Sequence, residues 1–221
     1  METAVTGPLT DKQLTDKQVA KLESGGVVAI PASWDDFMEF LHETRYRVEY
    51  HNGRMIVMGL AAFYHEVLIM AVGEILRRIL KGKGFYVAGS NVGVLQKEGK
   101  GYYNPDITVV KGKPAFRNKS TAIITNPYFV VEVLSESTAA YDLYHKMPKY
   151  QRIISIQEVI FIDRFDVSVT VCRRSETPKT WTLTAYENLD ESVLIAGEHQ
   201  VVLRDFFADL PDEALGEQAA Q

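Results

Sequence analysis

Two acidic residues, 26 positions apart, stand in apolar segments that are typical of buried strands. Asp106 follows a proline at the head of the run 107–110, which is rich in β-branched residues. Glu132 is the single charged residue of the run 128–134. An ionised carboxylate in a dry interior is costly without a compensating cation. The sequence therefore predicts that Glu132 has a metal ion, a basic partner or a bound proton.

A lysine follows these two acids in a segment with helical character. The polar turn 135–138 leads into this segment, which contains Asp142 and Lys146. Paired carboxylates suit a hard divalent cation such as Mg²⁺ or Mn²⁺, which takes oxygen ligands. Such an ion activates water and stabilises a leaving oxygen, while a lysine can hold the phosphate. The set predicts metal-dependent phosphodiester cleavage, with Asp106 and Glu132 as metal ligands and Lys146 as a catalytic residue.

Each of these residues also has a structural interpretation. Asp106 could be solvated at a strand end, and Glu132 could form a salt bridge with an arginine. Lys146 could be a solvated helix residue that pairs with Asp142, four positions earlier. The sequence leaves both interpretations open for each residue.

Glu49 is a further candidate for an outer carboxylate. It lies in a strand-like run, 46–50, that precedes Asn52-Gly53 and a second strand-like run. Asn-Gly at this place is the strongest short signal for a β-hairpin, because a type I′ turn needs positive φ at both central positions. The structural interpretation of Glu49 is a charge on the hairpin face that pairs with Arg47 or Arg54.

Three other residues have side chains that can take part in chemistry. His65 stands at the start of the longest predicted helix, where a surface or capping role is the simpler interpretation. Asp163 ends an apolar strand-like run, and we expect it to be structural. Cys172, the single cysteine, lies in a predicted β-meander without the context of a nucleophile. Patterns typical of a phosphate-binding loop, a dinucleotide site or a serine hydrolase are absent from the sequence.

Charge is distributed unevenly along the chain. The net charge is −5, so the protein as a whole is not an electrostatic binder of nucleic acid. Between residues 77 and 119, however, ten Lys and Arg stand against two acids, a local balance of +8. These basic residues could be ordinary surface lysines that flank loops. Their clustering around the Pro-Asp segment raises the alternative of a surface that faces phosphates.

Length and composition predict one main domain with short appendages. We expect an N-terminal appendage over residues 1–25, a main domain over 26–210 and an acidic flexible tail over 211–221. The longest apolar segment, residues 60–80, is interrupted by five ionisable residues, which argues against a membrane span. A single cysteine excludes an internal disulfide and, with no signal peptide, predicts a cytoplasmic setting.

The order of predicted elements indicates an α/β or α+β fold, with a mixed central sheet flanked by helices. Pro148 lies within the third long helix and predicts a kink or a break there, because proline costs about 3 kcal/mol in a regular helix. We expect a short N-terminal helix capped by Thr10 or Thr15, helices over 34–43, 61–81 and 138–154, hairpin strands over 46–50 and 54–58, strands over 85–88, 92–96, 104–110 and 128–134, a β-meander over 159–163, 167–173 and 180–186, and a strand or turn over 201–207.

At these residues the chain resembles the Uma2 family of restriction-endonuclease-like proteins, which is similar to a branch of the PD-(D/E)XK nuclease superfamily. The resemblance covers about residues 34–173. Its matching pieces, in order, are Glu49 before Asn-Gly, His65 at the start of the long helix, Pro105-Asp106, Glu132 in its apolar run, residues 141–146, Tyr150 and Asp163.

The resemblance implies a restriction-endonuclease-like mixed central sheet, a dependence on Mg²⁺ or Mn²⁺, DNA as the substrate and a homodimer. The superfamily usually has a lysine two positions after the second acid, where this chain has Leu134. The family pattern implies that the lysine has moved to the following helix, at Lys146. Glu136 and Pro148 are two further departures from the family pattern, and Pro148 could shift Lys146.

Two hypotheses of different classes follow. The first is a Mg²⁺-dependent endonuclease that uses Glu49, Asp106, Glu132 and Lys146. The second is a catalytically inactive protein of the nuclease fold that binds nucleic acid or has a structural role.

Overall fold

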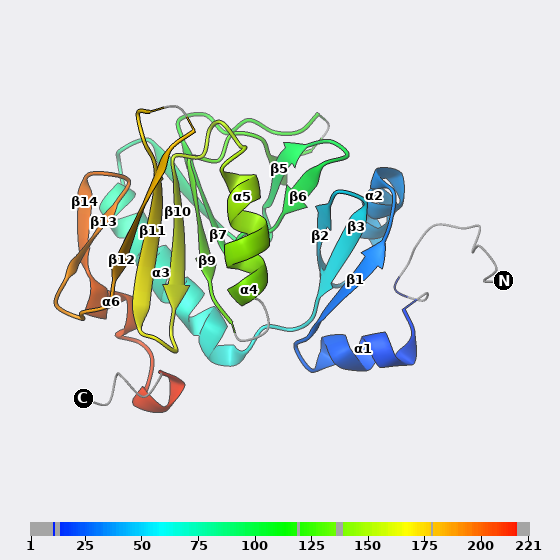
Figure 1. Ribbon diagram of the computed structural model, residues 1–221, viewed down its shortest axis with the longest axis horizontal. Coiled ribbons are helices and arrows are strands. Elements are labelled where there is room, and N and C mark those ends of the chain that lie inside the picture. Colours follow the sequence, from blue (N-terminus) through cyan, green and yellow to red (C-terminus); the bar gives the residue numbers. More distant parts are fainter. Residues whose placement is uncertain (1–10, 12–13, 119, 136–138, 178, 216–221) are drawn as a thin grey trace. The chain divides into compact units, whose positions relative to one another are not determined.

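The computed structural model describes residues 11, 14–118, 120–135, 139–177 and 179–215. The chain divides into two compact units (Figure 1). The first comprises Met1–Ala61 and Lys97–Tyr103, and the second comprises Ala62–Gln96 and Asn104–Gln221. The partition predicted from the sequence used other boundaries and stays a prediction. Its outermost segments, 1–10 and 216–221, lie outside the described residues.

The first unit is built on a sheet with the strand order β1-β3-β2-β6. Asn52 and Gly53 both have positive φ, of 44° and 89°, which confirms the predicted Asn-Gly turn. Capping boxes at Thr15 and Ser33 open its two helices, while the other candidate cap, Thr10, lies outside the described residues. The elements are α1 (Asp16–Glu23), β1 (Val27–Pro31), α2 (Trp34–Glu43), β2 (Arg47–His51), β3 (Arg54–Met58) and β6 (Gly101–Tyr103).

The second unit is organised around a six-stranded sheet with the order β12-β11-β10-β9-β7-β4. Strands β9 and β10 are parallel and the other neighbours are antiparallel, so the predicted mixed sheet is confirmed. The sheet consists of β4 (Phe85–Gly89), β7 (Ile107–Lys111), β9 (Phe129–Val133), β10 (Glu158–Asp163), β11 (Ser168–Arg174) and β12 (Trp181–Tyr186).

Smaller elements complete this unit. Strands β5 and β8 pair with each other in parallel, and β13 and β14 form a separate antiparallel hairpin. Residues 203–207 are helical, so the predicted strand or turn over 201–207 is correct only at its first two positions. The elements are β5 (Gly93–Lys97), β8 (Ile123–Ile124), β13 (Ser192–Ile195), β14 (His199–Val202), α6 (Leu203–Phe207) and a 3₁₀ turn (Asp212–Ala214).

Helices cover both faces of the six-stranded sheet. Helix α3 (Phe63–Leu80) packs on the face formed by Phe129, Val131 and Val133, within the main hydrophobic core. Because side chains alternate along a strand, Glu132 points to the opposite face. The helical segment 139–150 runs along that face (Figure 1). All five residues of β9 are buried, as predicted for a central strand.

Pro148 changes the helix that precedes it. The segment consists of α4 (Ala139–Tyr141), a π-helical turn η2 (Asp142–Lys146) and α5 (Met147–Tyr150). The N–H of Met147 donates to the carbonyl of Asp142, five residues earlier, and the ring of Pro148 occupies the first turn of α5. At the predicted kink or break, the structure thus has a π-helical turn, which is wider than an α-helical turn. The predicted extension of this helix to residue 154 is wrong, because the Arg174 guanidinium binds the carbonyls of Gln151 and Ile153.

Across the residues that the structure describes, no helix has the length and apolar character needed to span a membrane.

Candidate metal site

The β7–β9 ladder places Asp106 and Glu132 at the same level of two adjacent strands. Ile107 pairs with Val131 in this ladder. Asp106 directly precedes Ile107, and Glu132 directly follows Val131, so the two acids continue the register. Both are buried, with 4% and 2% of their surfaces exposed. The interpretation of Asp106 as a solvated strand end is therefore wrong.

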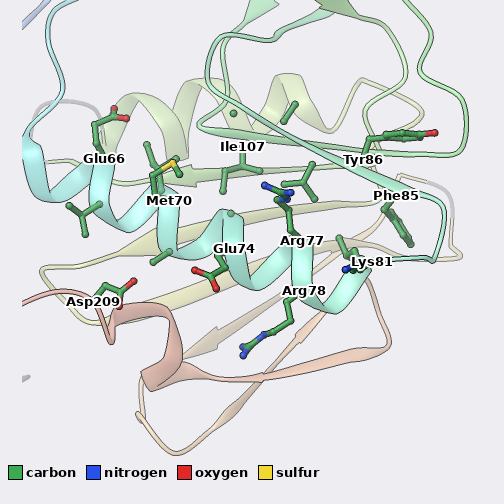
Figure 2. A pocket seen from close by; sticks show the side chains of 18 of the residues that line it. Glu66, Met70, Glu74, Arg77, Arg78, Lys81, Phe85, Tyr86, Ile107 and Asp209 are labelled. Atoms are coloured by element: carbon green, nitrogen blue, oxygen red, sulfur yellow. The ribbon is translucent and has the colours of Figure 1, made fainter.

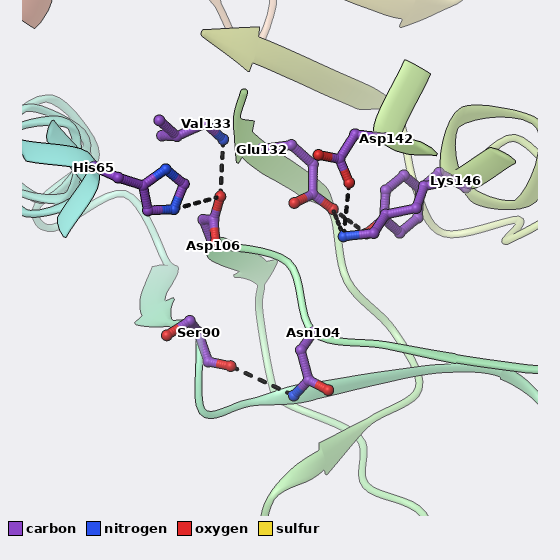
Figure 3. A network of polar contacts seen from close by, with 9 residues as sticks. His65, Ser90, Asn104, Asp106, Glu132, Val133, Asp142 and Lys146 are labelled. Carbon is purple, nitrogen blue, oxygen red and sulfur yellow. Dashed lines mark hydrogen bonds and ion pairs between the residues drawn. The ribbon is translucent and has the colours of Figure 1, made fainter. Parts of the chain in front are cut away.

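Asp106 is held by groups from two elements. Its Oδ2 accepts the backbone N–H of Val133 at 2.9 Å and lies 3.7 Å from Nε2 of His65 (Figure 3). His65 is buried in the first turns of α3, so the simpler interpretation of a surface residue is wrong. The helix and the neighbouring strand thus fix the Asp106 carboxylate at the start of β7.

Glu132 is held from the segment 139–150. Its Oε1 accepts hydrogen bonds from Nζ of Lys146 at 3.2 Å and from the hydroxyl of Tyr150 (Figure 3). Nζ of Lys146 also lies 2.9 Å from Oδ1 of Asp142. The spacing of four residues places Asp142, Lys146 and Tyr150 on one side of the segment.

The structural interpretation of Glu132 expected an arginine as its basic partner. The structure shows that this partner is Lys146. Only 3% of its surface is exposed, so the interpretation as a solvated lysine is wrong, whereas the pairing with Asp142 is confirmed. We call Asp106, Glu132, Asp142, Lys146 and Tyr150, together with His65, the polar cluster.

Glu49 lies in the other unit, and its role as an outer carboxylate stays a prediction. It is fully buried in β2 and stands opposite Ile56 of β3, not opposite Arg54. Arg54 stands two positions from Ile56 on the same face of β3, and the predicted pairing of Glu49 with Arg47 or Arg54 stays a prediction.

Three lysines near β7 in the second unit lie away from Asp106. Strand β4 pairs with β7 so that Phe85 faces Lys111 and Gly89 faces Ile107. Lys111 stacks over the rings of Phe85 and Tyr128, at 5.3 and 5.2 Å from their centroids. Lys81 and Lys83 directly precede β4 at this same end. Asp106 is at the opposite end of β7, so these lysines do not surround the polar cluster.

Two other candidates have structural surroundings. Asp163 accepts the backbone N–H groups of Phe165 and Asp166, at 2.8 and 3.2 Å, and so stabilises the turn after β10. Cys172 is a buried free thiol, and its burial raises the pKa of the thiol to about 11. It is protonated at neutral pH and therefore a poor nucleophile.

The donor set of the polar cluster fits a hard divalent cation. Mg²⁺ is usually bound through one or two carboxylates together with waters and substrate phosphates. Three carboxylates and one ammonium group are buried in this cluster, so a cation would improve its charge balance. Among the described residues there is no group of three or more His, Cys, Asp or Glu that could hold a metal. Asp106 and Glu132 are two carboxylates, a number of protein ligands with which Mg²⁺ is commonly bound.

Sequence reasoning gave no role to Tyr150 and treated Asp142 only as a structural partner of Lys146. The signal that could have found both is their spacing, four residues on either side of Lys146.

Comparison with known proteins identifies the family. The family model of Uma2, described as "Putative restriction endonuclease", matches residues 34–203. The chain belongs to the Uma2 family. Two curated relatives from Synechocystis sp., the uncharacterized proteins sll1609 and slr1290, are each 26% identical to it. The matches cover 59% and 71% of this chain, and 73% and 80% of the respective relative.

A solved structure supports the assignment of the fold. The crystal structure of a "putative nuclease belonging to DUF820" from Anabaena variabilis matches this Uma2 protein with a TM-score of 0.66 and 17% identity. The match covers 80% of this chain and 98% of that chain. The predicted fold class, a restriction-endonuclease-like mixed sheet flanked by helices, is confirmed.

Proposed function

We propose that this Uma2 protein is an endonuclease that hydrolyses phosphodiester bonds of DNA and depends on Mg²⁺ or Mn²⁺. The observation that supports this most directly is the pair of buried carboxylates, Asp106 and Glu132, at one level of adjacent strands. Membership of a family described as "Putative restriction endonuclease" supports the reaction class. A free, buried Cys172 suits the reducing cytoplasm that we propose as its setting.

Asp106 and Glu132 would hold the ion. When bound, such an ion lowers the pKa of a coordinated water and stabilises the developing charge on the phosphate. The side chains around the two carboxylates fix them before substrate arrives. The Val133 N–H and His65 orient Asp106, and the Tyr150 hydroxyl orients Glu132. Such outer contacts are expected to tune both the geometry and the affinity of a metal site.

Lys146 would bind a phosphate oxygen or orient the attacking water. Its ammonium group lies beside Glu132 and is also held by Asp142. Two carboxylate partners would hold the ammonium group close to the proposed position of the scissile phosphate. Glu49 would add an outer carboxylate, directly or through water.

The lysines at the far end of β7 would act at a distance. A five-residue strand spans roughly 14–17 Å, so Lys111 could contact the DNA backbone away from the cleaved bond. Contacts of this kind strengthen binding without sequence preference and weaken as salt is added.

One observation favours a second function, that of an inactive nuclease-fold protein that binds nucleic acid or has a structural role. Lys146 and Tyr150 both bind Oε1 of Glu132. These contacts alone can stabilise a buried glutamate, so the cluster could serve the fold only.

The deciding experiment incubates plasmid DNA with the protein and Mg²⁺ or Mn²⁺. We expect cleavage by the wild type and a loss of at least about 100-fold in Asp106→Asn and Glu132→Gln, because each variant removes a ligand charge. Calorimetry with Mn²⁺ alone should show binding to the wild type and weaker binding to both variants.

Glu158→Gln is the matched control. Glu158 is a second buried glutamate of the same sheet, outside the polar cluster. It should retain cleavage within a few-fold, which separates the loss of a ligand from damage to the fold. Cleavage that persists in both Asp106→Asn and Glu132→Gln would exclude this site. No cleavage by wild type and no heat of Mn²⁺ binding would favour the inactive protein.

A further inference from the structure

Thr108, the second residue of β7, has a buried hydroxyl group to which the proposed function gives no role. The side chain is fully buried, and its Oγ1 has no hydrogen-bond partner in the part of the chain that the structure describes. A buried hydroxyl without a partner destabilises the folded state, because the group has lost its hydrogen bonds to water. The residues on either side, Ile107 and Val109, are buried and apolar. Packing alone therefore does not account for a threonine at this position.

The side chain of Thr108 faces the same side of the sheet as Glu132. Ile107, the residue before it, lines a groove beside α3 (Figure 2). Because successive side chains of a strand point to opposite faces, Thr108 points away from α3. In the two ladders of β7, Thr108 stands opposite Val130 of β9 and Ala88 of β4. Glu132 follows Val130 by two positions and therefore shares this face with Thr108.

The next positions on this face include both proposed metal ligands. The side chains directly opposite Thr108, Val130 and Ala88, have no polar atoms. Asp106 lies two residues before Thr108, roughly 6.5 Å along the chain, and Glu132 lies diagonally across the ladder, roughly 7–8 Å away. A threonine side chain is too short to span such a distance. Two hydrogen bonds through one water molecule span about 5.5 Å, which is enough.

We propose that Thr108 is a positioning residue of the metal site, and that its hydroxyl holds a water of the hydration shell of the Mg²⁺ or Mn²⁺ ion. This inference rests on the proposed function, in which Asp106 and Glu132 bind the ion. Mg²⁺ bound through one or two carboxylates usually keeps several waters, each about 2.0–2.1 Å from the ion. A hydroxyl that accepts a hydrogen bond from such a water lies within about 5 Å of the ion.

The position of the hydroxyl is set by the fold before an ion binds. Strand β7 is paired on both sides, with β9 and with β4. Contacts to the outer shell of a metal site typically change the affinity for the metal by about 10–100-fold. Without the ion, the same hydroxyl contributes nothing favourable to the fold. Removing it should therefore weaken metal binding without destabilising the metal-free protein, a combination that a purely structural hydroxyl would not produce.

Calorimetric titration with Mn²⁺ alone and thermal unfolding in EDTA test this inference on the full chain. Thr108→Val replaces the hydroxyl with a methyl group of similar size. We expect the dissociation constant for Mn²⁺ to rise about tenfold. The melting temperature in EDTA should stay the same or rise by about 2–4 °C, because a buried hydroxyl without a partner has been removed. Thr108→Ser retains the hydroxyl and should bind Mn²⁺ within a few-fold of wild type.

Thr170→Val is the matched control. Thr170 of β11 and Glu132 of β9 both stand opposite Phe161 of β10, so they share a face of the sheet but lie two strands apart. This separation of roughly 9.5 Å is too long for one water to bridge. Thr170→Val should therefore bind Mn²⁺ as wild type does.

Unchanged Mn²⁺ affinity in Thr108→Val, beside a wild type that binds Mn²⁺, would overturn this inference and leave the nuclease proposal intact. A loss of affinity in Thr108→Ser as large as in Thr108→Val would also overturn it, because the hydroxyl would then not be the group responsible. A lower melting temperature of Thr108→Val in EDTA would show that the hydroxyl serves the fold, with the same consequence. A wild type that binds no Mn²⁺ would overturn this inference together with the proposed metal site.

Discussion

Two buried glutamates stand in neighbouring strands of the same sheet, and their surroundings differ. Glu158, at the start of β10, uses both oxygens: Oε2 accepts from Arg173 at 2.8 Å and Oε1 accepts the N–H of Ala196 at 3.0 Å. Arg173 stands directly opposite Glu158 in the β10–β11 ladder and also binds the carbonyl of Leu194. This pair fastens the β13–β14 hairpin to the sheet.

Glu132 lies toward the C-terminal end of β9, beside Asp106. Lys146 contacts both Glu132 and Asp142. Both of the contacts described above, from Lys146 and Tyr150, reach the same oxygen, Oε1. Burial of a carboxylate is therefore not by itself a sign of function, since Glu158 is as buried as Glu132. A second carboxylate at the same level of the sheet is what distinguishes the candidate site.

The largest difference between the two glutamates should appear in the free energy of unfolding when the basic partner of each, Lys146 or Arg173, is removed. Lys146→Met leaves Glu132 and Asp142 buried without their ammonium group, which should lower the free energy of unfolding by about 3–5 kcal/mol. Arg173→Met should lower it by less, about 2 kcal/mol, because the Arg173 side chain is 31% exposed and water can reach Glu158. Urea unfolding at pH 7 measures both values. An equal loss in the two variants would remove the distinction between the two glutamates.

The second-largest difference between the two glutamates should appear in how much Mn²⁺ stabilises the protein. An ion that binds only the folded protein stabilises it by about 2.7 kcal/mol at a concentration of 100 times its dissociation constant. We expect Mn²⁺ to stabilise wild type and Glu158→Gln in this way, but not Glu132→Gln, as thermal unfolding with increasing Mn²⁺ would measure. Loss of the effect in Glu158→Gln, with retention in Glu132→Gln, would place the ion elsewhere.

Tyr150→Phe tests whether the tyrosine positions Glu132. Loss of one hydrogen bond to a buried carboxylate should lower the free energy of unfolding by about 1 kcal/mol. If Tyr150 orients a metal ligand, the dissociation constant for Mn²⁺ should rise about tenfold. Tyr186→Phe is a suitable control, since its hydroxyl has only a long contact of 3.5 Å with the N–H of Leu194. Unchanged Mn²⁺ affinity in Tyr150→Phe would limit the tyrosine to a structural role.

The smallest expected effect concerns pH. Burial, only partly offset by the N–H of Ala196 and by Arg173, raises the pKa of Glu158 above its ordinary 4.5. A raised pKa means that the folded state binds the proton more tightly, so the contribution of Glu158 to stability is fully present below 4.5 and declines as pH rises through the raised value. The difference in unfolding free energy, wild type minus Glu158→Gln, should therefore fall with increasing pH across that window. Chemical unfolding between pH 4 and 7 measures it, and a rise would contradict the assignment.

The parts of the fold that the sequence predicted are those with strong local signals. The Asn52-Gly53 turn, the Ser33 cap and the apolar run that became β9 each depend on residues close in the chain. Strand β1 was missed because its short apolar run follows two glycines and is stabilised by distant pairing with β3. The inclusion of residues 97–103 in the first unit likewise depends on long-range contacts that no local pattern reveals.

The candidate site was predictable in part. Two acids in neighbouring apolar runs predicted a close pair, because sequential strands are often adjacent. The surroundings of that pair were not predictable, since the burial of Lys146 depends on how the chain accommodates Pro148. His65 and Tyr150 reach the site from opposite faces of the sheet, and only the packing of both layers brings them there.

The π-helical turn before Pro148 makes the site tolerant of one particular change in chain length. A turn of this kind contains one residue more than an α-helical turn. The N–H of Met147 bonds to the carbonyl of Asp142, five residues earlier, and removing one residue between Asp142 and Lys146 would make this a regular α-helical bond. The segment after the turn would keep its orientation, so Tyr150 would still face Glu132. In regular helix, by contrast, a one-residue deletion rotates everything after it by about 100°. We therefore expect a single-residue deletion to be better tolerated within this turn than elsewhere in the segment 139–150.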